Sequence, residues 1–92
     1  MAEQIKSKNR KMVDVTLGNW TSTAINDSGI YSCRFHGESD YCFFVFDATE
    51  VKVLADSWFT LNNSVQFKVE NNFLSVYYRD NSGTFEFNRI TM

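Results

Sequence analysis

Cysteine and histidine side chains gather in one short stretch of this 92-residue sequence. Cys33 and His36 are separated by two residues, and Asp40 and Cys42 follow shortly after them. Zinc prefers nitrogen and sulfur ligands in a tetrahedral arrangement, so these four side chains could form a metal site. A Cys–His pair could instead supply an activated thiolate nucleophile.

The strands that must position these residues argue against both kinds of site. Residues 30–36 and 39–46 form an expected hairpin, because the Gly-Glu dipeptide between them suits a two-residue type II′ turn. In that register Cys33 faces Cys42, whereas His36 lies on the opposite face of the hairpin. We therefore expect no metal, no cofactor and no catalytic residue, and we do not expect an enzyme.

The two cysteines have two open interpretations. Cys33 and Cys42 can be buried thiols that behave as small hydrophobic residues, which is the expected state in a reducing compartment. Because they face each other across the expected hairpin, they could also form a cross-strand disulfide in an oxidising one.

The segment after this hairpin has helical spacing. Asp47 can cap a first helical turn, and Glu50 stands three positions on, as in a capping box. The apolar positions that fall on one helical stripe are Val51, Leu54, Ala55, Trp58 and Leu61. We therefore predict one α-helix, about 48–61, packed on one face of the sheet.

Alternating residues predict strands on both sides of that helix. Asn71-Asn72 suits a type I′ turn, and pairing residue 70 with residue 73 gives a hairpin with one apolar face. The apolar residues of that face are Val65, Phe67, Val69, Leu74, Val76 and Tyr78, and Phe85 and Phe87 are expected to join it. Shorter strands are expected over 12–17 and 20–25. The predicted fold class is α+β, with an antiparallel sheet of about five to six strands and one packed helix.

The segment 27–33, DSGIYSC, resembles the tyrosine corner of an immunoglobulin domain, where a Tyr precedes the second disulfide Cys by two residues. The resemblance implies an earlier Cys and a Trp on other strands. Here Cys33 is the first cysteine, too little chain precedes the motif, and the helix predicted over 48–61 interrupts the strands. We therefore reject the resemblance and assign the chain to no family.

Length and charge limit the class of protein. We expect a flexible basic arm over 1–11 and a single domain over 12–92. The net charge is −2, and the arm holds four of the nine basic residues, so the body is acidic and nucleic acid is an unlikely main partner. No apolar window is long enough for a membrane helix, and no export signal follows the basic start. A cytoplasmic location is expected, in a host cell if the protein is phage-encoded.

Aromatic residues that cannot all face the predicted helix give the remaining functional indication. Residues 41–46, YCFFVF, are apolar on both sides, so this strand is expected to be central and covered on both faces. The expected partner-binding residues are Tyr41, Phe43, Tyr77 and Arg79, with Trp20 from a nearby loop. Exposed aromatic side chains commonly mark a contact surface. The alternative is that the first strand and the loop 18–29 fold over them.

We therefore expect a small cytosolic protein-binding module. It would act as a stoichiometric inhibitor, antagonist or adaptor that occludes the surface of a partner protein, in a bacterial or phage setting. An alternative partner is a second copy of the chain, in a homodimer formed through an edge strand or through the aromatic face. The alternatives are a single-stranded nucleic-acid binder that uses the aromatic residues and the basic arm, and a small enzyme or ligand-binding subunit.

Overall fold

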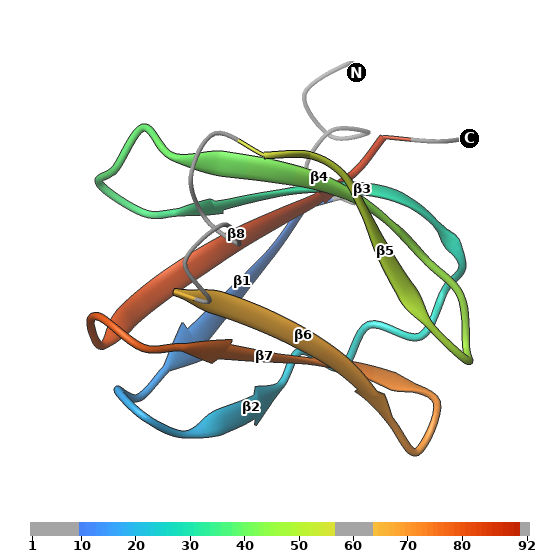
Figure 1. Ribbon diagram of the computed structural model, residues 1–92, viewed down its shortest axis with the longest axis horizontal. Helices are drawn as coiled ribbons and strands as arrows, with labels where there is room; N and C mark the ends of the chain where they lie inside the picture. Colours follow the sequence, from blue (N-terminus) through green and yellow to red (C-terminus); the bar gives the residue numbers. More distant parts are fainter. Residues whose placement is uncertain (1–9, 57–63, 91–92) are drawn as a thin grey trace.

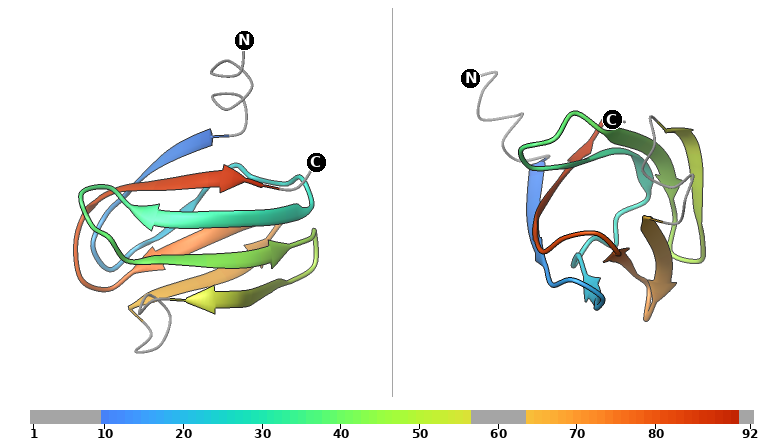
Figure 2. Two further views of the ribbon diagram at one scale, coloured as in Figure 1. Left: turned by 90° about the horizontal axis from the view of Figure 1, so that it is seen from above. Right: turned by 60° about the vertical axis from the view of Figure 1, so that its left-hand side comes forward.

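A computed structural model describes residues 10–56 and 64–90, which form eight strands in two antiparallel sheets (Figure 1). The strands are β1 (Arg10–Val15), β2 (Trp20–Ser22), β3 (Gly29–Phe35), β4 (Tyr41–Phe46), β5 (Val51–Asp56), β6 (Val65–Glu70), β7 (Phe73–Tyr78) and β8 (Gly83–Arg89). One sheet has the strand order β1-β8-β3-β4-β5 and the other β2-β7-β6. Figure 2 shows the five strands side by side in its left view and the two sheets facing each other in its right view. No helix within these ranges could span a membrane.

The α+β prediction is wrong, because β5 occupies the start of the segment predicted as a helix and pairs with β4. The Asp47 carboxylate does accept hydrogen bonds from the backbone N–H groups of Thr49 and Glu50, at 2.7 and 3.0 Å. However, the N–H of Asp47 also donates to the carbonyl of Glu50 and closes a hairpin turn. The same side-chain contact can start a helix or a turn, and here it is followed by the strand-forming sequence VKV. Trp58 and Leu61 lie outside the described residues.

The second sheet takes the place that the sequence analysis gave to the helix. Phe85 and Phe87 point inward and are fully buried, as predicted, but they belong to β8 of the five-stranded sheet rather than to the sheet of β6 and β7. Aromatic rings meet between the sheets, with centroids 4.8 Å apart for Phe44 and Phe67 and 5.1 Å apart for Tyr78 and Phe85. The fold is therefore a β-sandwich with an aromatic core.

The predicted hairpin registers are confirmed. Cys33 is the partner of Cys42 in the β3–β4 pair, and both are buried. In the β6–β7 pair Glu70 is opposite Phe73. Asn71 and Asn72 have φ angles of 55° and 71°, as a type I′ turn requires.

Tyr31 makes the contact by which a tyrosine corner is defined. Its hydroxyl donates a 2.6 Å hydrogen bond to the carbonyl of Asp27, four residues earlier. Cys33, however, faces Cys42 on the neighbouring strand of the same sheet, not a cysteine of the other sheet. The contact therefore anchors the segment before β3 without the inter-sheet cysteine pair of an antibody domain.

Two adjacent residues of β4 test the two-sheet arrangement. Phe44→Ala should lower the free energy of unfolding by about 3–5 kcal/mol, because its ring is fully buried between the sheets. Phe43→Ala should cost about 1–2 kcal/mol, because this ring points to the other face and is only half-buried. Urea denaturation followed by circular dichroism measures both, and equal losses would contradict the assignment of faces.

Candidate functional site

The outward-facing residues of the five-stranded sheet form the surface that we call the outer face. In β4 the residues Cys42, Phe44 and Phe46 are buried in the core, so alternation turns Tyr41 and Phe43 outward. The side chain of Tyr41 is 41% exposed, and its ring lies 5.5 Å from that of Phe43 in a T-shaped pair. β4 is an interior strand of its sheet, as predicted, and on its outward face Phe43 and Val45 are half-buried whereas Tyr41 is exposed.

The predicted partner-binding residues fall on two different surfaces. Tyr41 and Phe43 lie together on the outer face, as predicted for that pair. Trp20 and Tyr77 lie together in the other sheet, where β2 pairs with β7 and the two ring centroids are 5.4 Å apart. Because the two sheets pack through their inner faces, these two aromatic pairs are on opposite sides of the sandwich.

The surface around Trp20 is engaged by its own chain. The Lys68 ammonium lies 4.4 Å from the centroid of the Trp20 ring, a cation–π contact that covers one face of the indole. Arg79, just after β7, forms a 3.1 Å ion pair with Asp80 and a 3.2 Å hydrogen bond with Ser64. These side chains therefore support the three-stranded sheet and its turns. We take the outer face as the candidate for docking because a polar network lies beside its aromatic pair.

No protein-family model matches this chain, and no curated protein or solved structure shows significant similarity to it. The candidate site must therefore be judged by its own chemistry, which includes a polar network beside the aromatic pair.

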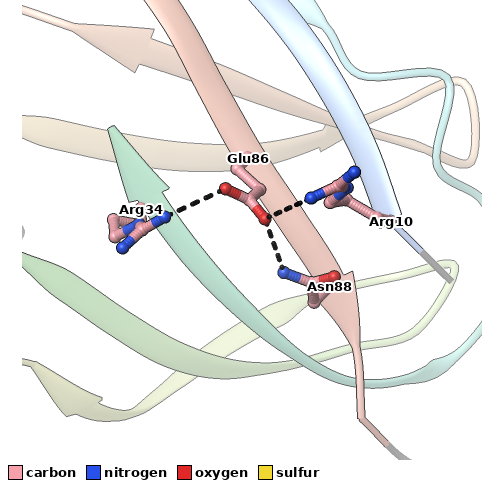
Figure 3. A network of polar contacts seen from close by, with 4 residues as sticks. All are labelled: Arg10, Arg34, Glu86 and Asn88. Carbon is pink, nitrogen blue, oxygen red and sulfur yellow. Dashed lines mark hydrogen bonds and ion pairs between the residues drawn. The ribbon is translucent and has the colours of Figure 1, made fainter. Parts of the chain in front are cut away.

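Glu86 of β8 is the centre of this network (Figure 3). Its carboxylate accepts a 3.2 Å hydrogen bond from Arg34 and a 3.3 Å hydrogen bond from Asn88, and lies 3.6 Å from the guanidinium of Arg10. The Glu86 side chain is 12% exposed, whereas both arginine side chains are 53% exposed. The outer face therefore presents the cations to solvent and keeps their shared carboxylate beneath them.

Local sequence patterns do not predict this network. Alternation within 83–89 and within 29–35 would place Glu86 and Arg34 on outward positions. However, only the β3–β8 pairing brings them together, and these residues are 52 positions apart in the chain. No local pattern specifies that pairing.

The pKa of Glu86 is the result of opposing effects. Burial on its own would raise the pKa of this carboxyl group. The hydrogen bonds from Asn88 and Arg34 and the charges of Arg34 and Arg10 outweigh burial, and the pKa falls below its ordinary value of 4.5.

The cysteines and the histidine do not come together as a reactive site. Cys33 and Cys42 are free thiols with no exposed surface. Burial raises the pKa of Cys33 well above its ordinary value, and the hydrogen bond with Cys42 raises it further, so the thiolate is disfavoured. His36 is exposed beyond the end of β3. Within residues 10–56 and 64–90, no three His, Cys, Asp or Glu side chains are grouped to hold a metal ion.

Thiol reactivity tests this burial. Ellman's reagent should modify neither Cys33 nor Cys42 in the folded protein at pH 8, and both after unfolding in guanidinium chloride. The variant Ser22→Cys places a thiol at an exposed strand position and should react at once, which provides the positive control. Rapid labelling of Cys33 or Cys42 in the folded protein would contradict their placement in the core.

The Glu86 network makes stability depend on pH. Because the pKa of Glu86 is lowered by folding, its contribution is present above the unfolded pKa and is lost as the pH falls through the folded value. Glu86→Gln should therefore melt at a lower temperature than the wild type at pH 7, and the difference should shrink towards pH 3. The control Glu70→Gln removes a carboxylate that is 59% exposed and lies 3.7 Å from the ammonium of Lys68, so it should melt close to the wild type at both pH values. A Glu86→Gln deficit that is the same at pH 7 and pH 3 would contradict this assignment.

Proposed function

We propose that this protein binds a partner protein through the outer face of its five-stranded sheet and thereby occludes the surface that it covers. The observation that carries the proposal is the exposed Tyr41–Phe43 pair next to the Arg10–Glu86–Arg34 network. Aromatic residues and arginine are the types most often found at the energetic centre of protein interfaces.

Apolar side chains lie around this network. Met12 of β1 is 48% exposed, and Ile90, directly after β8, is 52% exposed. The backbone N–H of Ile90 donates to the carbonyl of Ile30, which is opposite Val45 of β4, and both of these residues are half-buried. Apolar side chains around a polar network suit a protein partner better than a small soluble ligand.

The charges of the outer face indicate what the partner must offer. Among the described residues, Arg10, Arg34 and Lys52 are its cations, and Asp14 and Glu86 its anions. Three cations against two anions, of which the Glu86 carboxylate is largely covered, give the described part of this face a positive balance. We therefore expect a partner that offers carboxylates opposite this network and apolar side chains around them.

The size of the outer face makes an edge strand part of the contact. Five strands about 4.8 Å apart and six residues of about 3.3 Å each span roughly 20 Å by 20 Å, or about 400 Å². A partner in a stable complex typically covers about 800 Å². The edge strand β5 borders this face, where Lys52 is opposite Val45, and Leu54 of this strand is 52% exposed, so we include it in the proposed interface.

A nucleic-acid strand is a weaker candidate for the same face. Stacking on Tyr41 and Phe43 would suit unpaired bases. However, binding a phosphate backbone needs several clustered cations, whereas the described charges of this face are three cations and two anions, a balance of only +1. The chain as a whole also carries a net charge of −2.

The protein would act as a stoichiometric inhibitor, antagonist or adaptor in the cytoplasm of a bacterial or phage-infected cell. Two buried cysteines that remain thiols suit a reducing compartment. A second copy of the chain, docked through the outer face or β5, is the competing protein partner.

Two exposed aromatic rings on opposite sheets provide a matched test. Tyr41 and Trp20 are both 41% exposed, so Tyr41→Ala and Trp20→Ala remove similar exposed surface. The tagged wild type should capture one or a few proteins in stoichiometric amounts from nuclease-treated extract of its native cells, detected by mass spectrometry. Tyr41→Ala should lose them, and Trp20→Ala should retain them.

Three results would contradict the proposal. The captured protein could be retained equally by Tyr41→Ala and the wild type. It could be lost only with Trp20→Ala. The wild type could also capture nucleic acid alone before nuclease treatment. Sedimentation equilibrium of the purified chain identifies self-association, which would make the second copy the partner.

A further inference from the structure

A cavity of about 300 Å³ opens at one end of the sandwich, and one of its lining residues, Arg10, also belongs to the outer face. It lies where β1 begins and β8 ends, beneath the segment that joins β2 to β3. Its lining combines cations with apolar and aromatic side chains: Arg10, Lys11, Ala24, Ile25, Asn26, Asp27, Tyr31, Phe87 and Arg89. Its volume is at the lower end of the range for small-molecule sites.

Two of these cations occupy inward-facing strand positions. Val13 and Val15 of β1 are buried, and alternation places Lys11 on the same face. Phe85 and Phe87 of β8 are likewise buried, and Arg89 follows them on that face. Lys11 and Arg89 therefore continue the inner face of the sheet and bring positive charge to the mouth of the core.

The pairing of the strands brings these positions close together. Lys11 is opposite Phe87, and Arg89 is opposite Tyr31. Both cations thus have a core aromatic residue as their cross-strand neighbour, which gives the cavity a charged rim over an aromatic wall.

The Arg89 guanidinium is only partly satisfied by the described residues. One of its terminal nitrogens donates a 2.7 Å hydrogen bond to the carbonyl of Ser28, and its buried Nε has no hydrogen-bond partner within that part of the chain. A carbonyl oxygen is neutral and does not balance the charge. An anion beside Arg89 would do so, since hydrogen bonds between charged groups are the stronger ones.

Hydrogen bonds and backbone conformation restrain other residues of the cavity lining. Tyr31 donates its hydroxyl hydrogen to the carbonyl of Asp27 at 2.6 Å, and Ile25 is tied to Leu74 by a 2.9 Å backbone hydrogen bond. Ala24 is held at a φ of 60°, which is uncommon for a residue other than glycine. A wall restrained in this way needs little reorganisation to receive a ligand.

Protection of sheet edges does not explain both cations. An inward-pointing lysine on an edge strand discourages association between sheets, and β1 is an edge of its sheet. Arg89, however, belongs to β8, which lies between β1 and β3. A charge at an interior strand needs another reason.

We propose that this cavity binds a small organic anion, in which a phosphate monoester or carboxylate group meets Lys11 and Arg89 and an apolar group lies against Phe87, Ile25 and Tyr31. Asp27 is the one acidic residue of the described lining, so the site retains a positive balance even though Arg10 shares its charge with Glu86. A neutral ligand has no electrostatic attraction to Lys11 and Arg89 of this kind, so it should bind more weakly.

Nuclear magnetic resonance titration of the full-length, ¹⁵N-labelled protein tests this proposal. Phenyl phosphate and benzoate are the two anionic probes, and benzyl alcohol is the neutral one. Either anion should shift the amide signals of residues 24–27, Tyr31 and Arg89, and the tighter of the two identifies the anionic group. Benzyl alcohol should shift none of them at the same concentration.

Variants of Lys11 and Arg89 then test whether these two cations bind the anion. Lys11→Gln and Arg89→Gln should each weaken binding of the preferred anion by at least about tenfold, as expected for loss of one charge-assisted hydrogen bond. Lys52→Gln, on the outer face, is the matched control and should bind as the wild type does. If Arg89→Gln does not fold, Lys11→Gln alone decides, because Lys11 is exposed at the sheet edge.

The proposal is overturned if neither anion shifts these signals at 10 mM, if benzyl alcohol shifts them equally, or if both Gln variants bind as the wild type does. None of these outcomes bears on protein docking, because Lys11, Arg89 and the residues whose amide signals are followed are not part of the outer face.

Discussion

Contact between the aromatic inner faces of the two sheets is the constraint on which the rest of the structure depends. Phe44 and Phe85 are fully buried in it and meet Phe67 and Tyr78 of the opposite sheet. Because strand residues alternate between faces, fixing Phe44 inward fixes Phe43 outward. The aromatic pair of the outer face is therefore a consequence of how the core is filled, and a shift of β4 by one residue would destroy both at once.

The sequence predicts those parts of the fold that local chemistry determines. The turn residues Asn71-Asn72 and the alternation around them specify the β6–β7 register, and the same logic aligns Cys33 with Cys42. The number of sheets is not determined in this way. The pairings of β8 with β1 and β3 join distant segments, and an amphipathic sequence after Asp47 fits a helical stripe and an edge strand equally well. Tertiary packing decides between them.

The same distinction explains how much of the candidate site could be foreseen. Tyr41 and Phe43 lie two residues apart on one strand, so alternation alone puts them together. Tyr77 was assigned to their surface because a single sheet has only two faces, whereas a sandwich has two separate outer surfaces. Glu86 contacts Arg34 and Arg10 because three strands come together in the folded chain. The amino-acid composition does not indicate these contacts.

The first two residues of β1 connect the docking face with the cavity. Arg10 turns outward to Glu86, and Lys11, its neighbour, takes the inward position beside Phe87. Both belong to the segment 1–11 that is predicted as a flexible basic arm, yet each has a defined partner in the sheet. Strand alternation thus places these two neighbouring cations on different faces. Arg10 joins the ion-pair network of the outer face, and Lys11 lies at the rim of the cavity. Charge near a chain end therefore has to be assigned to faces before it is assigned to a function.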